Sequence, residues 1–469
     1  MGPSDKTQSA TDAHQLPLPP YPDEIGHRLT HTFRTMPDVL AFRDAAMRSN
    51  DVARTYLFGV GDIYNLTHPS HFKRVLIDDR ENFKKSDDFR IAFGDGLVAA
   101  EGDLWQQQRK LLQPLFSNEQ IESYVSEMIN QIHRRTNVWR DGETIDLQRE
   151  MRRLTLDILF ATLFGRELEL GGDSSIHTAA TNLHEWFAPT SYPLPRWIPT
   201  PARRRFKQGR EKLQNIADQL LEKKSSGSPA NSADTADLLS LLVGLRESAG
   251  SRSVLSDSQL RDQVVTLIFA GHETTASTLA LALYEIFRKP AVRDRFHAEI
   301  DGLSSPITPD ILDSLPVTER IVTETLRMYP PVYVLPREST QQITIDEYRI
   351  PSEVPVWLGI RQVHRDDRFY ESPSTFQPSR WDGSLKESIP NFAYAPFGGG
   401  PRLCIGRQFA LTEAKLALAI IGRKYTLTHS TAETSNNGQT GESITPDPPL
   451  TADMTLRLTP GTEFYISER

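Results

Sequence analysis

The sequence predicts a mainly α-helical protein with small β-sheets, an α+β arrangement. Apolar residues recur at three- and four-residue spacing through the long middle of the chain, as amphipathic helices require. Short β-branched and proline-rich segments gather near residue 60 and again after residue 330. The 469 residues, of which 38% are hydrophobic and 24% charged, have the composition of an ordinary globular protein.

The elements follow in order along the chain. Residues 1–22 are polar and proline-rich, so we expect a flexible N-terminal tail and one folded domain over residues 23–469. Strands are predicted within 54–67 and helices over 104–116, 119–139 and 151–165, the last apolar around most of its circumference and therefore buried. Loops are expected at 223–235 and 429–449, where Ser, Gly and Asn gather. The later strands are predicted within 330–340, 342–351, 354–360 and 454–467.

Charge and cysteine content exclude several classes of protein. The formal net charge of −8 argues against a general nucleic-acid binder. The single cysteine, Cys404, excludes an internal disulfide and a cysteine-rich zinc or iron–sulfur site. We find no run of about 18 apolar residues and no apolar core in the N-terminal segment, so we expect no transmembrane segment, no secretion signal and a cytoplasmic location.

One long helix is predicted between Ser256 and Pro290, with a polar interruption at its centre. Ser256 and Gln259 have the spacing of a capping box, and the proline ends the run. The segment GHETT (271–275) breaks an otherwise apolar pattern. It is either a mild kink with a solvated face or a local opening, in which a threonine hydroxyl bonds back to a carbonyl and the glutamate supplies a proton. Ala276 stands where the metalloprotease motif H-E-x-x-H needs its second histidine, which excludes that class.

Cys404 lies in the glycine-rich segment FGGGPRLCIG (397–406), directly before a strongly helical run. A thiolate ligand to iron needs a lowered pKa, shielding from water and a backbone that closely approaches a flat macrocycle. Glycines permit that approach, and a helix N-terminus favours negative charge. Phe397 could shield the sulfur, and Arg402 could bind a carboxylate at the macrocycle edge. The alternative is a cysteine that serves as a small buried apolar side chain.

These residues resemble the haem-binding pattern F-x-x-G-x-R-x-C-x-G of the cytochrome P-450 family, soluble prokaryotic type. Phe397, Gly400, Arg402, Cys404 and Gly406 match every fixed position. The segment AGHETT (270–275) resembles the family's oxygen-activation motif in its central helix.

Three further motifs follow the family's order over roughly residues 35–469. Glu324 and Arg327 match E-x-x-R, and QPSRW (377–381) supplies Arg380 as the third member of a buried Glu–Arg–Arg cluster, although Ser379 and Trp381 depart from the usual letters. Without the family, this cluster would be a surface ion pair worth little. WQQQR (105–109) and Arg337 occupy the positions of contacts to the haem propionates.

The resemblance implies a cytochrome P-450 fold with one large haem domain, and haem b as the cofactor. Cys404 would be the axial ligand of the iron, and Thr274 and Glu273 the catalytic acid–alcohol pair that delivers protons. The cofactor-binding residues would be Trp105, Arg109, Ala270, Gly271, Arg337, Phe397, Gly400, Arg402, Cys404 and Gly406.

The implied reaction is a monooxygenation, in which one oxygen atom of O2 enters an apolar substrate by hydroxylation or epoxidation. The substrate would be a fatty acid, a terpenoid or a steroid-like molecule, and the enzyme a monomer. Because the chain carries no flavin- or NAD-binding extension, electrons would come from a separate ferredoxin- or flavodoxin-type partner. We expect that partner to dock on a basic patch formed by Arg109, Arg402, Arg407 and Lys415.

Two other functions remain open, a haem-thiolate isomerase or peroxygenase that uses peroxide, and a haem protein that carries a ligand without turnover. Peroxide-using relatives generally lack the acid–alcohol pair, and a carrier has no need to deliver protons. By analogy with the family, the substrate pocket would be lined by Phe89, Ile91, Phe93, Leu97, Phe269, Ala270, Val334, Leu335 and Met454.

Overall fold

The computed structural model describes residues 16–35, 38–47, 50–170, 174–187, 197–226, 238–240, 242, 255–304, 307–430 and 447–469. Most of each loop expected at 223–235 and 429–449 lies outside the described residues, as do residues 1–15 of the predicted tail.

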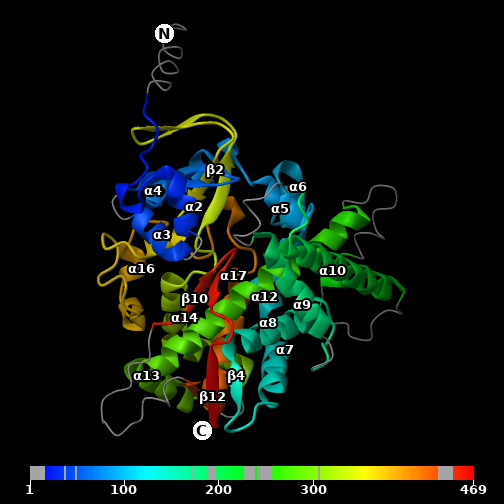
Figure 1. The fold of residues 1–469 in the computed structure, drawn as a ribbon. Coiled ribbons are helices and arrows are strands. Elements are labelled where there is room, and N and C mark those ends of the chain that lie inside the picture. The colour runs from blue at the N-terminus through cyan, green and yellow to red at the C-terminus, as the bar shows by residue number, and fades with distance from the viewer. Residues whose placement is uncertain are drawn as a thin grey trace, which may run out of the picture.

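The described part of the chain is a large helical body with small sheets along one side and at one end (Figure 1). The α-helices are α2 (His31–Thr35), α3 (Val39–Ala46), α4 (Pro69–Lys73), α5 (Asp87–Phe93), α6 (Gly102–Leu112), α7 (Asn118–Thr136), α8 (Leu147–Leu163), α9 (Ser174–Asn182), α10 (Pro201–Ser226), α12 (Asp257–Arg288), α13 (Pro290–Asp301), α14 (Pro316–Met328), α15 (Ile360–His364), α16 (Leu385–Ser388) and α17 (Arg407–Lys424).

Short helical turns connect many of these helices. They are η1 (Asp23–Ile25), η2 (Arg28–Thr30), the π-helical η3 (Arg74–Asp78), η4 (Arg80–Asn82), η5 (Gln113–Phe116), η6 (Leu183–Phe187), η9 (Pro309–Ser314), η10 (Pro378–Trp381) and η11 (Gly400–Arg402). The strands are β1 (Val52–Leu57), β2 (Gly61–Leu66), β3 (Phe83–Lys84), β4 (Thr144–Asp146), β5 (Leu335–Ser339), β6 (Ile343–Ile345), β7 (Tyr348–Ile350), β8 (Pro355–Leu358), β9 (Tyr425–His429), β10 (Leu450–Ala452), β11 (Leu456–Leu458) and β12 (Glu463–Glu468).

The largest sheet has the strand order β1-β2-β8-β5-β3, with β2 and β8 parallel and the other neighbours antiparallel. It joins the N-terminal strands to strands from residue 335 onward, as the blue and yellow ribbons in Figure 1 show. A second sheet has the order β4-β12-β9, and two hairpins are formed by β6–β7 and β10–β11. The strands predicted from β-branched content are therefore present, and the α+β fold class is confirmed.

Helix α12 crosses the helical body and packs along α8 and against α10, α14 and α17 (Figure 1). Its N-terminus carries the predicted capping box, in which Ser256 and Gln259 bond to each other's backbone N–H groups. α12 and α8 are buried on nearly all sides because they lie in the middle of the core.

By length and mean hydropathy alone, α12 is able to span a membrane, which our expectation from the sequence missed. However, 83% of its most apolar stretch is buried inside the protein. A core helix of a globular protein has this same character, so the finding is weak evidence for a membrane span.

The prediction of a flexible N-terminal tail over residues 1–22 is wrong for the last residues of that range. The carbonyl oxygens of Pro17 and Pro20 accept hydrogen bonds from the backbone N–H groups of Arg349 and Arg54, and the Tyr21 hydroxyl bonds to Asp62. These contacts, and a hydrogen bond from Arg349 Nε to the carbonyl of Leu16, hold residues 16–21 against the strands.

Candidate active site

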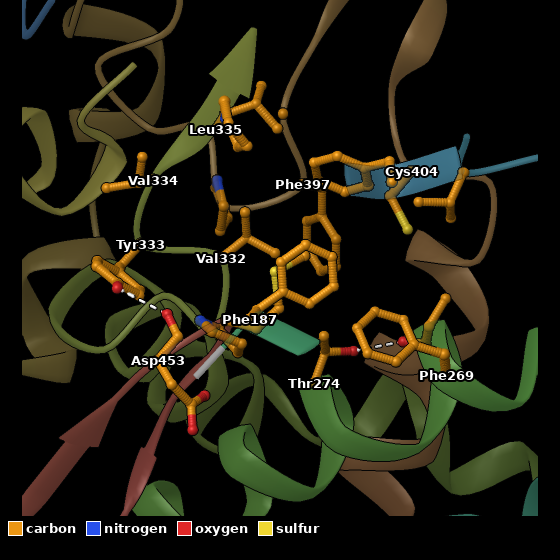
Figure 2. Close-up of a pocket in the computed structure, with 18 of the residues that line it drawn as sticks. Phe187, Phe269, Thr274, Val332, Tyr333, Val334, Leu335, Phe397, Cys404 and Asp453 are labelled. Carbon is orange, nitrogen blue, oxygen red and sulfur yellow. Dashed lines mark hydrogen bonds between the residues drawn. The ribbon is translucent and has the colours of Figure 1, made fainter. Parts of the chain in front are cut away.

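A cavity of about 480 Å³ lies between α12 and the loop that precedes α17. Figure 2 shows Thr274 of α12 and Cys404 of the loop on opposite sides of this space, with Phe397 beside the cysteine. Most of the remaining lining is apolar and includes Phe187, Phe269, Val332, Val334 and Leu335. The cavity therefore brings the two segments that the sequence singled out to one apolar site.

Cys404 has its side chain exposed to the cavity and lies three residues before α17 begins. Its backbone N–H bonds to the carbonyl of Phe397, which closes the loop under the sulfur. The surrounding protein excludes water and raises the pKa of the Cys404 thiol, although the backbone N–H of Gly406 and the charges of Arg109 and Arg407 act in the opposite direction. The expectation of a lowered pKa is therefore wrong for the Cys404 thiol in the protein without cofactor, because desolvation outweighs these contacts.

Thr274 lines the cavity, and its hydroxyl donates a 2.8 Å hydrogen bond to the carbonyl of Ala270, one turn earlier in α12. This is the back-bond that the sequence predicted. The helix itself continues through GHETT without interruption, so the expected opening of its hydrogen-bond ladder is not seen. Ala270 and Gly271 also line the cavity.

Glu273 lies on a different side of α12 from Thr274, because successive residues of a helix point about 100° apart. It is completely buried and does not line the cavity. Its Oε1 accepts a 2.6 Å hydrogen bond from Arg152 of α8, and Arg457 and His184 lie 3.9 and 4.0 Å from its carboxylate oxygens. Burial would raise the pKa of Glu273, but the charge and hydrogen bond of Arg152 lower it to about 2.

Glu273 is thus an ionised, paired carboxylate at neutral pH and not a reservoir of protons. Any proton that it passes to the cavity must first be bound, and binding requires that the ion pair with Arg152 loosens. The predicted acid–alcohol pair is adjacent in sequence, but only its alcohol faces the cavity.

Three cationic side chains, Lys85, Arg337 and Arg402, line another side of the cavity. Arg402 bonds to the carbonyl of Ala100 and to the carboxylate of Glu101, and Arg337 bonds to the carbonyl of Pro336. Burial and the neighbouring charge of Arg402 lower the pKa of Arg337 to about 10. Burial, Arg337 and Arg402 lower the pKa of Lys85 well below its usual range.

Trp105 and Arg109 lie outside the cavity lining and contact the residues around Cys404. Arg109 donates a 2.8 Å hydrogen bond to the carbonyl of Leu403, next to Cys404, and does not line the cavity. The guanidinium carbon of Arg402 lies over the Trp105 ring, 4.6 Å from the ring centroid. Both residues therefore contact the cysteine loop and Arg402, and their contact to the cofactor stays a prediction.

The glycines of the site serve close packing of the chain. A Cβ on Gly400, which has a φ of 65°, would lie 2.5 Å from the carbonyl oxygen of Leu76. A Cβ on Gly271 would lie 2.9 Å from Leu159 of α8. Gly406 is the N-cap of α17 and also lines the cavity.

The residues at the cavity fit a haem. A thiol faces the space from one side, and an α-helix with small residues borders the other. Lys85, Arg337 and Arg402 share one neighbouring carboxylate, Glu101, so an excess of positive charge borders this side of the cavity. The two propionates of haem b would neutralise that excess.

The substrate-pocket predictions are met only in part. Phe89, Phe269, Ala270, Val334, Leu335 and Met454 line the cavity. Phe93 and Leu97 are buried behind it, where Phe93 packs on Phe269 with the ring centroids 4.4 Å apart. Ile91 is partly exposed and also lies outside the lining.

The predicted Glu–Arg–Arg cluster is confirmed. Glu324 and Arg327 are fully buried and joined by two hydrogen bonds of 2.8 and 2.9 Å. Arg380 bonds to the same carboxylate at 3.0 Å, and the indole of Trp381 donates to it at 2.8 Å. The tryptophan that departs from the family's usual letters thus gives the glutamate one more hydrogen bond.

Sequence reasoning missed Lys85, Arg152 and Arg457. Lys85 follows another lysine in an exposed-looking segment, and Arg152 is one of two arginines in a helix otherwise predicted to be buried. The one available signal was this charge inside a buried helix, because a buried arginine needs a partner. The partner is 121 residues away in the chain, so spacing alone could not reveal it.

Comparisons with known proteins agree with this geometry. A family model described as Cytochrome P450 matches residues 38–453. The pentalenene oxygenase of Streptomyces avermitilis is 31% identical over 409 residues, which cover 85% of this chain and 89% of the relative. The cyclooctat-9-en-7-ol 5-monooxygenase of Streptomyces melanosporofaciens is 30% identical over 407 residues, which cover 85% and 87%.

Solved structures share the fold over nearly the whole chain. The haem domain of cytochrome P450DA superposes with a TM-score of 0.79 and 25% identity, covering 97% of this chain and 98% of that one. The retinoic acid-bound cyanobacterial CYP120A1 gives a TM-score of 0.79 at 23% identity, covering 97% and 100%, which is a likeness of fold alone.

Proposed function

Because this chain belongs to the cytochrome P450 family and is a haem b-dependent monooxygenase, we propose that it oxygenates an apolar, terpenoid-like substrate with electrons from a separate protein. The observation that carries this proposal is the placement of Cys404 and Thr274 on opposite sides of one apolar cavity. Two of the relatives are named as oxygenases of pentalenene and of cyclooctat-9-en-7-ol, which supports a terpenoid-like substrate here.

We assign the residues to two groups. Cys404 would hold the iron, and Lys85, Arg337 and Arg402 would hold the propionates. When bound, haem b activates dioxygen for the transfer of one oxygen atom to the substrate. Thr274 would donate a hydrogen bond toward the reacting oxygen and hold water beside it. Glu273 would bind a proton from its surroundings when its ion pair with Arg152 loosens, and would pass that proton toward this water.

The apolar walls would orient the substrate and exclude bulk water. Phe89, Phe187 and Phe269 form one aromatic wall. The ring centroids of Phe89 and Phe187 lie 5.6 Å apart. Val332, Val334 and Leu335, at the start of β5 and just before it, form a second, aliphatic wall. A substrate that contacts both walls is held by buried apolar area, with little help from hydrogen bonds.

For the redox partner, the predicted basic patch must be revised. Arg407 is exposed, but Lys415 bonds to the carbonyl of Leu312 and lies 3.5 Å from Glu319, and Arg402 faces the cavity. We propose that the partner docks around Arg407 on the surface behind Cys404. Its class, the monomeric state, the cytoplasmic location and a single haem domain over residues 23–469 remain predictions.

The test is a reduced, CO-bound spectrum of the haem-loaded protein, followed by turnover with surrogate ferredoxin and flavodoxin partners on a panel of terpenoids in ¹⁸O2. We expect a strongly red-shifted Soret band that is lost in Cys404→Ser, and product that carries one labelled oxygen atom. Arg407→Glu should slow reduction by the partner but leave chemical reduction unchanged. Product formed only with hydrogen peroxide would favour a peroxygenase, and binding without any product would favour a ligand carrier.

A further inference from the structure

We propose that Arg43 binds a carboxylate at the end of the substrate remote from the oxidised carbon, so that the substrate is an amphipathic acid. This inference rests on the proposed function, because it takes the cavity to be the substrate site. It adds a chemical class that the apolar lining alone does not give.

Arg43 is a buried cation in the cavity wall. It belongs to α3, is only 4% exposed and lines the cavity together with Val39, Phe42 and Trp357. Its guanidinium lies 5.1 Å from the ring centroid of Trp357. Its Nη2 donates a 3.2 Å hydrogen bond to Oδ1 of Asn65, a neutral group, and its Nε is buried with no partner.

No carboxylate within the described residues forms an ion pair with Arg43. Its sequence neighbour Asp44 binds Arg361 at 3.1 Å and Gln362 at 2.9 Å. Burial lowers the pKa of the Arg43 guanidinium, and Tyr333 and Asp44 offset this only in part. A buried charge without a counter-ion is costly, so proteins ordinarily pair one or keep it for a ligand.

Arg43 is separate from the cations that we assign to the haem propionates. Asn65 and Trp357 pair in register between β2 and β8, so their side chains share one face of the large sheet. Arg337 pairs with Val356, the neighbour of Trp357, and therefore lies on the opposite face. Arg43 packs on the first face and Arg337 on the second, so the two arginines serve different parts of the cavity.

The surroundings of Arg43 define what it would bind. A guanidinium binds a carboxylate through two parallel N–H···O bonds, and a desolvated site strengthens them. Near Arg43 the lining offers Thr55 and Tyr333 as further polar groups, whereas Val39, Phe42 and Ile63 are apolar. Thr274 and Cys404 line the same cavity, and most of its remaining lining is apolar. An occupant of the whole length would carry an acid at the α3 end and an apolar body elsewhere.

The experiment is isothermal titration calorimetry of the haem-loaded protein with two matched pairs of probes, dodecanoate with dodecan-1-ol and abietate with abietinol. Each pair differs only in the carboxylate. We expect the acid to bind at least about tenfold more tightly than the alcohol in both pairs, as a charge-assisted bond predicts.

Two variants test whether Arg43 is the cause. Arg43→Gln removes the charge, and Asn65→Asp places a counter-ion where the asparagine already receives the hydrogen bond. Both should abolish the preference for the acid and leave the affinity for the alcohol within about twofold, whereas Arg43→Lys should retain part of the preference. Asn65→Asp keeps Arg43 in place, so it gives an answer even if Arg43→Gln does not fold. Arg34→Gln, an exposed arginine on α2, is the control for a change of net charge.

Equal affinity for acid and alcohol in the unchanged protein, absence of binding by both acids, or a preference that survives Asn65→Asp would each overturn the proposal. Failure of this proposal is distinguishable from failure of the proposed function, because the proposed function is tested by the CO spectrum and the labelled product, and this proposal by the binding preference.

Discussion

Arg152 of α8 donates a 2.6 Å hydrogen bond to Glu273 of α12, and the carboxylate that receives it is completely buried. This contact sets the protonation state of the residue next to Thr274, because it holds the pKa of Glu273 at about 2 against the effect of burial. It also fixes α8 to α12 beside the cavity.

We predict that Arg152→Gln destabilises the protein at neutral pH and that acid reverses part of the loss. In the unchanged protein the pKa of Glu273 is lower than its ordinary value of 4.5, so the pair contributes stability above pH 4.5 that is lost as the pH falls toward 2. Without Arg152, burial favours the neutral acid and raises the pKa, so the ionised carboxylate becomes a penalty at neutral pH. Urea unfolding at pH 7.5 should show a loss of about 3 kcal/mol, and a smaller one at pH 5.

Arg153→Gln is the matched control for this prediction. Arg153 pairs with Glu150 one turn away on the same helix and is about one-third exposed. We expect a loss below about 1 kcal/mol at both pH values. An equal loss for the two variants, or no dependence on pH for Arg152→Gln, would contradict the role that we give to the buried pair.

We predict that Thr274→Ala reduces product formation by about 10²-fold while substrate binding changes little, because the hydroxyl orders protons at the reacting oxygen and contributes little contact area. Electrons should be diverted from product to hydrogen peroxide, which is measured as product formed per NADPH consumed. Thr162→Ala on α8 removes a comparable back-bond of 2.7 Å away from the cavity and should leave this ratio unchanged. Unimpaired coupling in Thr274→Ala would remove Thr274 from the proton path.

We predict that Lys85→Gln and Arg337→Gln have opposite effects on the empty and the haem-loaded protein. In the absence of haem each change relieves repulsion among Lys85, Arg337 and Arg402, so the apoprotein should unfold at a higher urea concentration. Haem should be lost faster, by about tenfold in transfer to apomyoglobin, because a propionate loses its cation. Lys84→Gln is the control, since Lys84 is the sequence neighbour of Lys85, pairs with Glu338 and does not itself line the cavity. Slower haem loss in either variant would refute the assignment.

We predict that Gly400→Ala destabilises the loop before Cys404 by about 1–3 kcal/mol. The φ of 65° is unfavourable for alanine, and the new Cβ would approach the carbonyl oxygen of Leu76 to 2.5 Å. Thermal unfolding measures the loss, and the CO spectrum reports whether the cysteine keeps its place. Gly383→Ala is the control, because no atom lies within 4 Å of its Cβ position and its φ is ordinary. A neutral Gly400→Ala variant would show that the loop can move away.

Local patterns were sufficient to predict much of the fold. The capping box of Ser256 and Gln259, the buried helix α8 and the strands after residue 330 follow from neighbouring residues, and each is present. The tail was misjudged because its fixed part is held by the distant residues Arg54 and Arg349. The mean hydropathy of α12 was underestimated because the polar segment at its centre separates two apolar halves of the helix.

The site was predictable where a motif places residues on one loop, as it does for Phe397, Arg402 and Cys404. It was not predictable where two helices meet. Nothing near Glu273 in the sequence indicates Arg152, and nothing near Arg43 indicates that Asn65 and Trp357 are its neighbours. Desolvation of the Cys404 thiol was missed for the same reason, since it results from the walls of the cavity and not from the adjacent residues.

The chain contains one cysteine, and its side chain opens into the cavity. If Cys404 holds the haem iron as proposed, a haem-loaded molecule has no free thiol for an alkylating reagent, whereas an empty molecule has one. Mass spectrometry after maleimide treatment, long enough for a thiol whose pKa is raised, would then count the molecules that lack cofactor without any need for colour or turnover.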